Sequence, residues 1–204
     1  GGTGLYLNSL IYNMDFAKSN GNSKLREQLE KELEENGIDY MHEKLKSLDE
    51  DAASRIHKNN TKRVIRALEV CLSGNKMQDF SNDLKYNEEY LPIIIVLNRD
   101  RKVLYDRINK RVDIMMENGL IEEVKKLLNM GYNKDLISMQ GIGYKEIVKY
   151  LEGEYTLDEA VEIIKRDSRR YAKRQITWFK RYENSKWFDL DKYDDKEILK
   201  KEIL

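Results

Sequence analysis

Features that mark several common protein classes are scarce in this sequence. Cys71 is the single cysteine, so no intrachain disulfide can form, and the chain suits a reducing compartment. No apolar run approaches the roughly 20 residues that a helix needs to cross a bilayer, and no stretch reads as a secretory signal. We therefore expect a cytoplasmic protein with no membrane contact.

Catalytic and metal-binding signatures are also missing. No glycine is followed directly by lysine, so the phosphate-binding pattern G-x-x-x-x-G-K-[ST] does not occur. His42 and His57 lie far apart, and neither has a cysteine or carboxylate at metal-ligand spacing. We predict no metal site formed by this chain and see no local signature of a catalytic triad.

The composition that remains is that of a packed, helix-rich protein. Of the 204 residues, 40% are hydrophobic and 36% are charged, with one proline and 11 glycines. The 37 basic and 37 acidic side chains cancel, so the molecule as a whole does not attract nucleic acid. Any polyanion site must therefore be a local cluster of basic side chains.

The carboxyl half has the pattern of an α/β fold. Pro92–Asn98 is a short apolar run rich in β-branched side chains, which predicts a strand buried on both faces of a sheet. Apolar residues then recur every three or four positions and predict helices that end before Gly119 and Gly131. Thr156 and Glu159 fit a capping box at the start of a third, long helix. A last short strand is predicted at Trp187–Leu190.

The segment before this half has a different sequence pattern. Helices are predicted around Leu25–Leu33, Tyr40–Leu48 and Asn60–Leu72, with no strand-like run among them, and polar turns at Ser19–Asn22 and Ser81–Asp83 bound the segment. We therefore expect residues 19–90 to form a helical insertion domain, between residues 1–18 and 91–204 of one core α/β domain.

The chain opens on the sequence GGTGLY, which leads into a helix-like segment. Glycines permit close approach to the main chain, so a phosphate or a base could lie beside Thr3. The same pattern also fits a tight strand-to-helix turn with no ligand. Because Gly1 stands where a methionine is usual and the segment begins abruptly, we expect a piece of a longer protein.

Basic side chains gather on two predicted helices of the carboxyl half. Arg107 and Arg111 are four residues apart and could hold two phosphate oxygens, or could be neutralised by Asp106, Asp113 and Glu117. Residues 165–181 contain eight basic side chains and one acid, a pattern that favours an RNA backbone contact over a merely solvated helix face. A smaller basic group lies at residues 58–66 of the insertion.

Five blocks in fixed order carry a resemblance. They are GGTGLY at the start, HKNNTKRVIRALEV at 57–70, LNRDRKVLYDRINKRVDIMMENGLIEEV at 97–124, SMQGIGYKEIVKYLEGE at 138–154 and RRYAKRQITWFKR at 169–181. Together they resemble the tRNA dimethylallyltransferase family. No one block is specific, but the order and spacing of the set are.

The resemblance implies a P-loop NTPase-like, kinase-like α/β core with a helical insertion domain. The implied reaction moves a dimethylallyl group from dimethylallyl diphosphate to N6 of adenosine 37, beside the anticodon, in tRNAs that read codons beginning with U. The adenine is flipped into a channel, and Mg²⁺ is the implied ion, held mainly by the diphosphate and a segment absent here. A monomer is implied, with tRNA and the prenyl diphosphate as its partners.

The resemblance also implies roles for individual residues. Thr3 would lie near the flipped adenine, and Arg111 would hold the leaving diphosphate. The implied tRNA contacts are Arg26, Lys62, Arg63, Val64, Ile65, Arg66, Gln140, Gly141, Ile142, Gly143, Tyr144, Lys145, Arg169, Arg170, Lys173, Arg174 and Gln175.

One departure from the family limits what this chain can do. The family's P-loop and general-base aspartate precede GGTGLY and are not in the sequence, so nucleotide-binding residues cannot be assigned and we expect this chain to be inactive alone. We also expect an incomplete sheet with exposed apolar edges. An isopentenyltransferase of free adenosine nucleotides, a P-loop phosphotransferase and a noncatalytic RNA-binding protein remain as alternatives.

Overall fold

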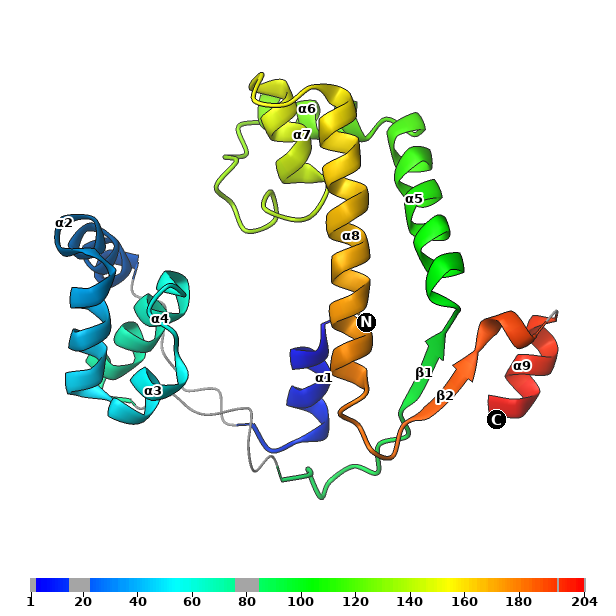
Figure 1. Ribbon diagram of the computed structural model, residues 1–204, viewed down its shortest axis with the longest axis horizontal. Coiled ribbons are helices and arrows are strands. Elements are labelled where there is room, and N and C mark those ends of the chain that lie inside the picture. The colour runs from blue at the N-terminus through cyan, green and yellow to red at the C-terminus, as the bar shows by residue number, and fades with distance from the viewer. Residues whose placement is uncertain (1–2, 15–22, 76–84, 194, 204) are drawn as a thin grey trace. The chain divides into compact units, whose positions relative to one another are not determined.

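The computed structural model describes residues 3–14, 23–75, 85–193 and 195–203. These residues divide into two compact units (Figure 1). The amino-terminal unit spans Leu5–Tyr90, and the carboxyl-terminal unit combines the described part of Gly1–Gly4 with that of Leu91–Leu204. The predicted turns at Ser19–Asn22 and Ser81–Asp83 lie outside the described residues, and the assignment of 19–90 as an inserted domain stays a prediction.

Three helices form the core of the amino-terminal unit. They are α2 (Ser23–Leu48), α3 (Glu50–Arg55) and α4 (Thr61–Leu72). Gly37 interrupts α2 with a positive φ of 80°, which separates its two predicted halves. Leu29, Leu45 and Leu68 are fully buried where α2 and α4 pack together. The three predicted helices are confirmed, while the short α3 was not predicted.

The same unit also contains α1 (Gly4–Ile11) apart from its first residue, and an isolated antiparallel bridge. Tyr12 pairs with Tyr86, and their ring centroids lie 4.9 Å apart. The main-chain amide of Asn87 donates to the carbonyl of Ile11 at 2.8 Å. The bridge thus holds the end of α1 beside the segment that leads to Tyr90.

The carboxyl-terminal unit contains a parallel pair of strands, β1 (Ile95–Asn98) and β2 (Lys186–Asp189), with Val96 opposite Trp187. Both strands were predicted, and the α/β class is confirmed. The prediction that the first strand is buried on both faces is wrong, because Leu97 is 53% exposed and only Val96 is buried. A two-stranded sheet offers too few neighbours to cover both faces, and its apolar edge is exposed as expected.

Helices of the carboxyl-terminal unit pack on one another around a second core (Figure 1). They are α5 (Arg101–Glu117), α6 (Leu120–Asn129), α7 (Tyr144–Leu151) and α8 (Leu157–Phe179), and they are followed after β2 by the 3-10 turn η1 (Leu190–Lys192) and α9 (Lys196–Ile203). Val124, Ile147 and Ile164 are buried where α6, α7 and α8 meet. No described helix is both long and apolar enough to span a membrane.

Local signals explain where these helices begin and end. Gly119 has a φ of 89° between α5 and α6, a conformation that only glycine adopts readily. Thr156 begins α8: its hydroxyl accepts from the amide of Glu159 at 3.3 Å, while its own amide donates to the Glu159 carboxylate at 2.8 Å. These contacts confirm the predicted capping box and hold the pKa of Glu159 below its ordinary value.

We predict that Thr156→Ala lowers the free energy of unfolding by about 1 kcal/mol, because the first turn of α8 loses its side-chain cap. Denaturant titration with circular dichroism measures the change. Thr156→Ser keeps the hydroxyl and serves as the control, with less than half the loss expected. Equal losses for the two variants would contradict the role of the hydroxyl.

Candidate active site and nucleic-acid interface

A cavity of about 670 Å³ lies within the carboxyl-terminal unit, between α5, the segment 140–142 and α8. Its polar lining includes Arg111 from α5, Gln140 from the segment, and Arg174 and Gln175 from α8. Residues from three separate sequence blocks, each predicted to contact diphosphate or tRNA, therefore line one space.

Arg111 is the cation that α5 contributes to this cavity. Its side chain is exposed, and it forms no ion pair with any residue that the structure describes. Asp113, one of the acids weighed as its partner, instead pairs with Lys165 at 2.7 Å. Arg107 is exposed on the same helix but does not line the cavity. Of these two arginines of α5, Arg111 is thus the one placed to meet an anion there.

The segment before α7 is shaped by main-chain contacts. Gly143 has a φ of 104°, and its amide donates to the buried carboxylate of Glu146 at 2.8 Å. The amide nitrogen of the Gln140 side chain donates to the carbonyl of Lys134 at 2.8 Å. These bonds fix the loop so that Gln140, Gly141 and Ile142 form part of the cavity wall.

The remaining members of this predicted tRNA-binding block, Gly143, Tyr144 and Lys145, do not line the cavity. Gly143 is buried at the start of α7. The hydroxyl of Tyr144 donates to Glu123, which raises the pKa of the phenol, and Lys145 lies 3.3 Å from Glu146. The structure therefore engages these three residues in contacts within the unit.

The basic side chains of α8 differ in what they contact. Lys165 is bound by Asp113, whereas Arg166 bonds to Asp167 at 2.9 Å and lowers the pKa of that carboxyl group. Arg169 donates to Asn109 at 2.5 Å and is half-buried. The amino-terminal part of this cationic stretch is thus largely engaged within the protein.

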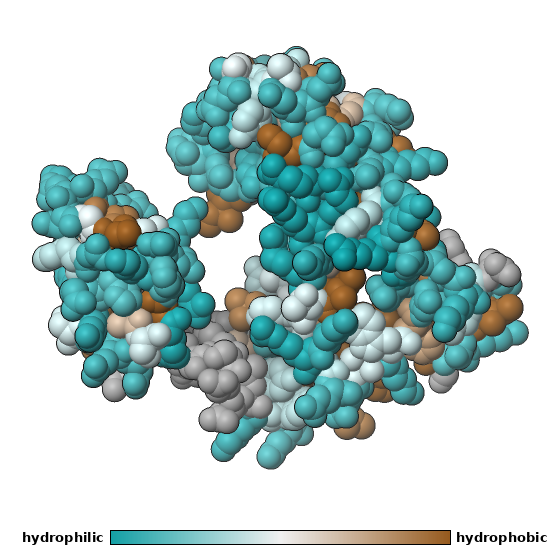
Figure 2. Space-filling view, in the orientation of Figure 1, coloured by the Kyte–Doolittle hydropathy of each residue, from teal (hydrophilic) through white to brown (hydrophobic). Residues whose placement is uncertain are grey.

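Farther along α8, the basic side chains face solvent. Arg170, Lys173 and Arg174 are exposed, and with Trp178 and Arg181 they line a second cavity of about 480 Å³. Arg181 lies over the indole of Trp178, 4.8 Å from its centroid. The surface along α8 is strongly hydrophilic (Figure 2). Exposed guanidinium groups beside an aromatic ring suit a nucleic-acid backbone.

Thr3 is exposed and does not line either cavity, although the main chain that follows it is fixed near the end of α8. The Tyr182 hydroxyl accepts from the indole nitrogen of Trp178 at 3.2 Å and donates to the carbonyl of Gly4 at 3.3 Å. A β-carbon added to Gly4 would overlap the Trp178 ring. Gly4 is thus favoured by close packing against Trp178, a reason that the sequence did not indicate. Gly1 and Gly2 lie outside the described residues.

The predicted tRNA contacts of the amino-terminal unit divide by burial. Lys62 and Arg63 are exposed at the start of α4, whereas Val64 and Ile65 are buried in the helical core. The side chains of Val64 and Ile65 therefore cannot contact RNA, which corrects that part of the prediction. Their positions follow from the helical period, which turns them inward.

Arg26 and Arg66 share one acidic partner in this unit. The carboxylate of Glu69 lies 3.0 Å from Arg66 and 3.8 Å from Arg26, and its side chain is only 7% exposed. Both guanidinium groups remain about half exposed. Arg26 also donates to the exposed carboxylate of Glu30 at 3.1 Å, so the buried charge of Glu69 helps to place both arginines while they still reach the surface.

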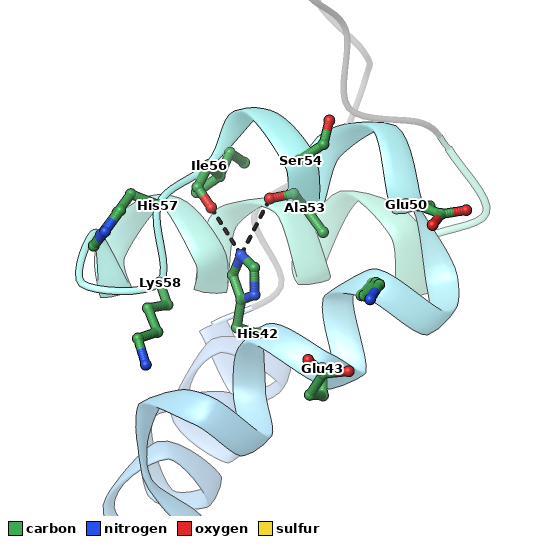
Figure 3. A pocket seen from close by; sticks show the side chains of 9 residues that line it. His42, Glu43, Glu50, Ala53, Ser54, Ile56, His57 and Lys58 are labelled. Carbon is green, nitrogen blue, oxygen red and sulfur yellow. Dashed lines mark hydrogen bonds between the residues drawn. The ribbon is translucent and has the colours of Figure 1, made fainter.

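A further pocket of the amino-terminal unit surrounds His42 (Figure 3). The Nε2 atom of His42 lies 2.8 Å from the carbonyl oxygen of Ile56 and 3.1 Å from that of Ala53, at the end of α3. His42 thus donates to helix-terminal carbonyls and has a structural role. Among the described residues, no three His, Cys, Asp or Glu side chains are grouped to hold a metal ion.

Comparison with known proteins decides the family. The model of the IPP transferase family matches residues 1–182. The chain belongs to the IPP transferase family. It is 77% identical over its whole length to a tRNA dimethylallyltransferase of Clostridioides difficile (strain 630) and 59% identical to one of Alkaliphilus oremlandii (strain OhILAs), and it covers 66% of each of these relatives.

Solved IPP transferases have the same fold. A tRNA isopentenylpyrophosphate transferase of Bacillus halodurans is 44% identical with a TM-score of 0.59, and the alignment covers 97% of this chain and 61% of that one. A eukaryotic dimethylallyltransferase acting on tRNA is 26% identical with a TM-score of 0.72, over 98% of this chain and 54% of that one. The predicted resemblance and P-loop NTPase-like class are confirmed.

Other cavity residues of this IPP transferase were not predicted as site residues. Ser168 and Tyr171 of α8 line the larger cavity, as do Ile108 and Met115 of α5. The apolar period that includes Ile108 and Met115 had indicated only the inward face of α5. A sequence pattern indicates which face of a helix is turned inward, but not where two inward faces leave a cavity between them.

We predict that Gly4→Ala destabilises the carboxyl-terminal unit of this IPP transferase, because the new methyl group overlaps Trp178. A loss of about 1–3 kcal/mol is expected, the usual cost of overpacking, and thermal denaturation measures it. Trp178→Leu in the Gly4→Ala background should cost less than the sum of the two single substitutions. Simple additivity would contradict a direct contact.

Proposed function

We propose that this chain is the greater part of a tRNA dimethylallyltransferase. The observation that carries the proposal is the cavity of the carboxyl-terminal unit, which brings Arg111, Gln140 and Arg174 together from three of the sequence blocks that carry the resemblance. The family membership supports it, since relatives that share the whole chain are tRNA dimethylallyltransferases. The proposed acceptor is N6 of adenosine 37 in tRNAs that read codons beginning with U.

In the proposed reaction, the N6 lone pair attacks C1 of dimethylallyl diphosphate. A nitrogen–carbon bond forms, the C1–oxygen bond breaks, and the diphosphate leaves with the electron pair. N6 then loses its proton to a base outside this chain. Arg111 would stabilise the charge that develops on the diphosphate, since it faces the cavity without an acidic partner among the described residues. Thr3 would lie beside the adenine.

Both units would contact tRNA. On the carboxyl-terminal unit, the exposed Arg170, Lys173 and Arg174 would bind phosphates, with Gln175 at the cavity wall. On the amino-terminal unit, Lys62 and Arg63 are exposed, and Glu69 holds Arg26 and Arg66 at the surface. The other predicted block, residues 140–145, would contact tRNA through the main-chain and side-chain atoms that it exposes.

We further propose Mg²⁺ as the cofactor, a monomeric state, and action in the cytoplasm, where tRNA is used. The described residues do not themselves fit a metal site, so no Mg²⁺ ligand is assigned here and no step depends on the ion. In the proposal, the diphosphate and the part of the relatives that this chain does not span would hold it.

Two related activities are distinguished by their substrates. An isopentenyltransferase of free adenosine nucleotides needs no tRNA-sized surface, and the exposed cations of α8 and α4 argue against it. A P-loop phosphotransferase would move phosphate from ATP and would not consume a prenyl diphosphate. Label transfer from dimethylallyl diphosphate to tRNA, to AMP or to neither separates the three.

The decisive experiment is prenyl transfer measured on a protein of known intact mass. If the mass exceeds 24.3 kDa and label enters unmodified tRNA, the proposal holds. If the mass equals that of this chain, we expect no transfer until the segment that completes the relatives is supplied. Failure of the completed protein to label tRNA would overturn the proposal.

We predict that Arg111→Ala lowers kcat for tRNA prenylation in the completed enzyme by about 10²–10³-fold, because one donor to the leaving group is lost. The dissociation constant for tRNA should change little. Arg107→Ala removes the same charge from the same helix but away from the cavity, and it should leave kcat within about threefold, since an exposed charge contributes little. Equal losses would contradict the assignment.

A further inference from the structure

Two polar contacts join α5 to α8 along one side of their interface. Arg169 of α8 donates to the side-chain oxygen of Asn109 at 2.5 Å, and Lys165 lies 2.7 Å from the carboxylate of Asp113. The partners are four residues apart on each helix, so both contacts fall on one face of α5 and one face of α8. They form a two-step polar ladder between antiparallel helices.

The apolar part of this interface is sparse on the α5 side. Val112 is the one buried residue of α5, a helix of 17 residues, and it packs in the same core as Ile164 of α8. Met115 and Met116 are only partly buried against this core, so apolar packing fixes the rotation of α5 less firmly than a fully buried stripe would. The ladder supplies the directional contacts that apolar packing lacks.

Rotation of α5 matters because Arg111 sits between the two steps of the ladder. Successive residues turn by about 100° around a helix, so Arg111 points away from the face that carries Asn109 and Asp113, toward the cavity that Ile108 and Met115 also line. A rotation of α5 that broke the ladder would carry the Arg111 guanidinium out of its place in the wall.

We propose that Lys165 and Arg169 are positioning residues, which fix the rotation and register of α5 against α8 so that Arg111 faces the cavity. The inference rests on the proposed function, and it gives Arg169 a role other than the predicted contact with tRNA. Lys165 is only 16% exposed on its side chain, and Arg169 is half-buried, so neither is presented to an RNA backbone as Lys173 is. The hydrogen bond to Asp113 also raises the pKa of Lys165.

The test uses the completed enzyme, with kcat, KM for dimethylallyl diphosphate and tRNA affinity over a range of salt concentrations. Asp113→Lys should lower kcat on the order of 10²-fold, the usual effect of a small misplacement of a catalytic group. tRNA affinity should stay within about threefold of wild type, because the ladder does not touch the RNA. Adding Lys165→Asp to Asp113→Lys restores an ion pair in which the two charges are exchanged. The kcat of the double variant should be at least about tenfold higher than that of Asp113→Lys alone.

The lower step of the ladder has its own matched pair of variants. Asn109→Asp keeps an acceptor for Arg169 and should retain kcat within about threefold, whereas Asn109→Leu removes it and should lower kcat about tenfold or more. This pair decides the question even if the charge reversal prevents folding. Equal kcat values for the two Asn109 variants, or no recovery on charge exchange, would overturn the proposal.

A direct RNA contact predicts a different result. Arg169→Gln would then weaken tRNA binding and reduce the slope of log affinity against log salt by about one, as Lys173→Ala is expected to do. That outcome with unchanged kcat would overturn the positioning role while leaving the proposed function intact. The proposed function fails separately, if the wild-type enzyme transfers no label to tRNA.

Discussion

The contact between α5 and α8 is the constraint on which the candidate site depends. These helices line the larger cavity together with the segment 140–142. Arg111 has no described acidic partner to hold it, so its direction follows from the rotation of α5. The cation proposed to be catalytic is therefore placed by its helix, and the helix is placed by two polar contacts and by the apolar packing of Val112, Met115 and Met116.

The basic side chains of α8 do not all have the same role. The protein has no net charge, so a uniform attraction to RNA is absent and the positions of individual charges decide where a polyanion can bind. Lys165 and Arg169 are used for packing, whereas Lys173 and Arg174, about one turn after Arg169, are left exposed. One basic stretch in the sequence thus serves two physical purposes.

Sequence patterns predicted the helices well because each rests on local chemistry. Thr156 and Glu159 cap α8 through contacts three residues apart, and Gly119 ends α5 through its own backbone conformation. Burial of β1 was predicted wrongly because it depends on neighbours distant in sequence: Leu97 has the apolar character of a two-sided core strand but little to pack against. Local signals indicate an element, while its environment is set by the rest of the fold.

In the candidate site, too, features that depend on nearby residues could be predicted, whereas contacts between residues far apart in the sequence could not. Arg111 and Arg174 could be singled out by charge and by resemblance, but the sequence gives no means of seeing that Arg169 bonds to Asn109, 60 residues away. Charge alone could not distinguish Arg169 from Lys173. The same holds for Arg26 and Arg66, whose shared partner Glu69 is buried by the core of its unit. Basic residues of one type therefore acquire different roles only when the fold decides which of them meet an acceptor inside the protein. Those that remain exposed form the surface that we propose for RNA.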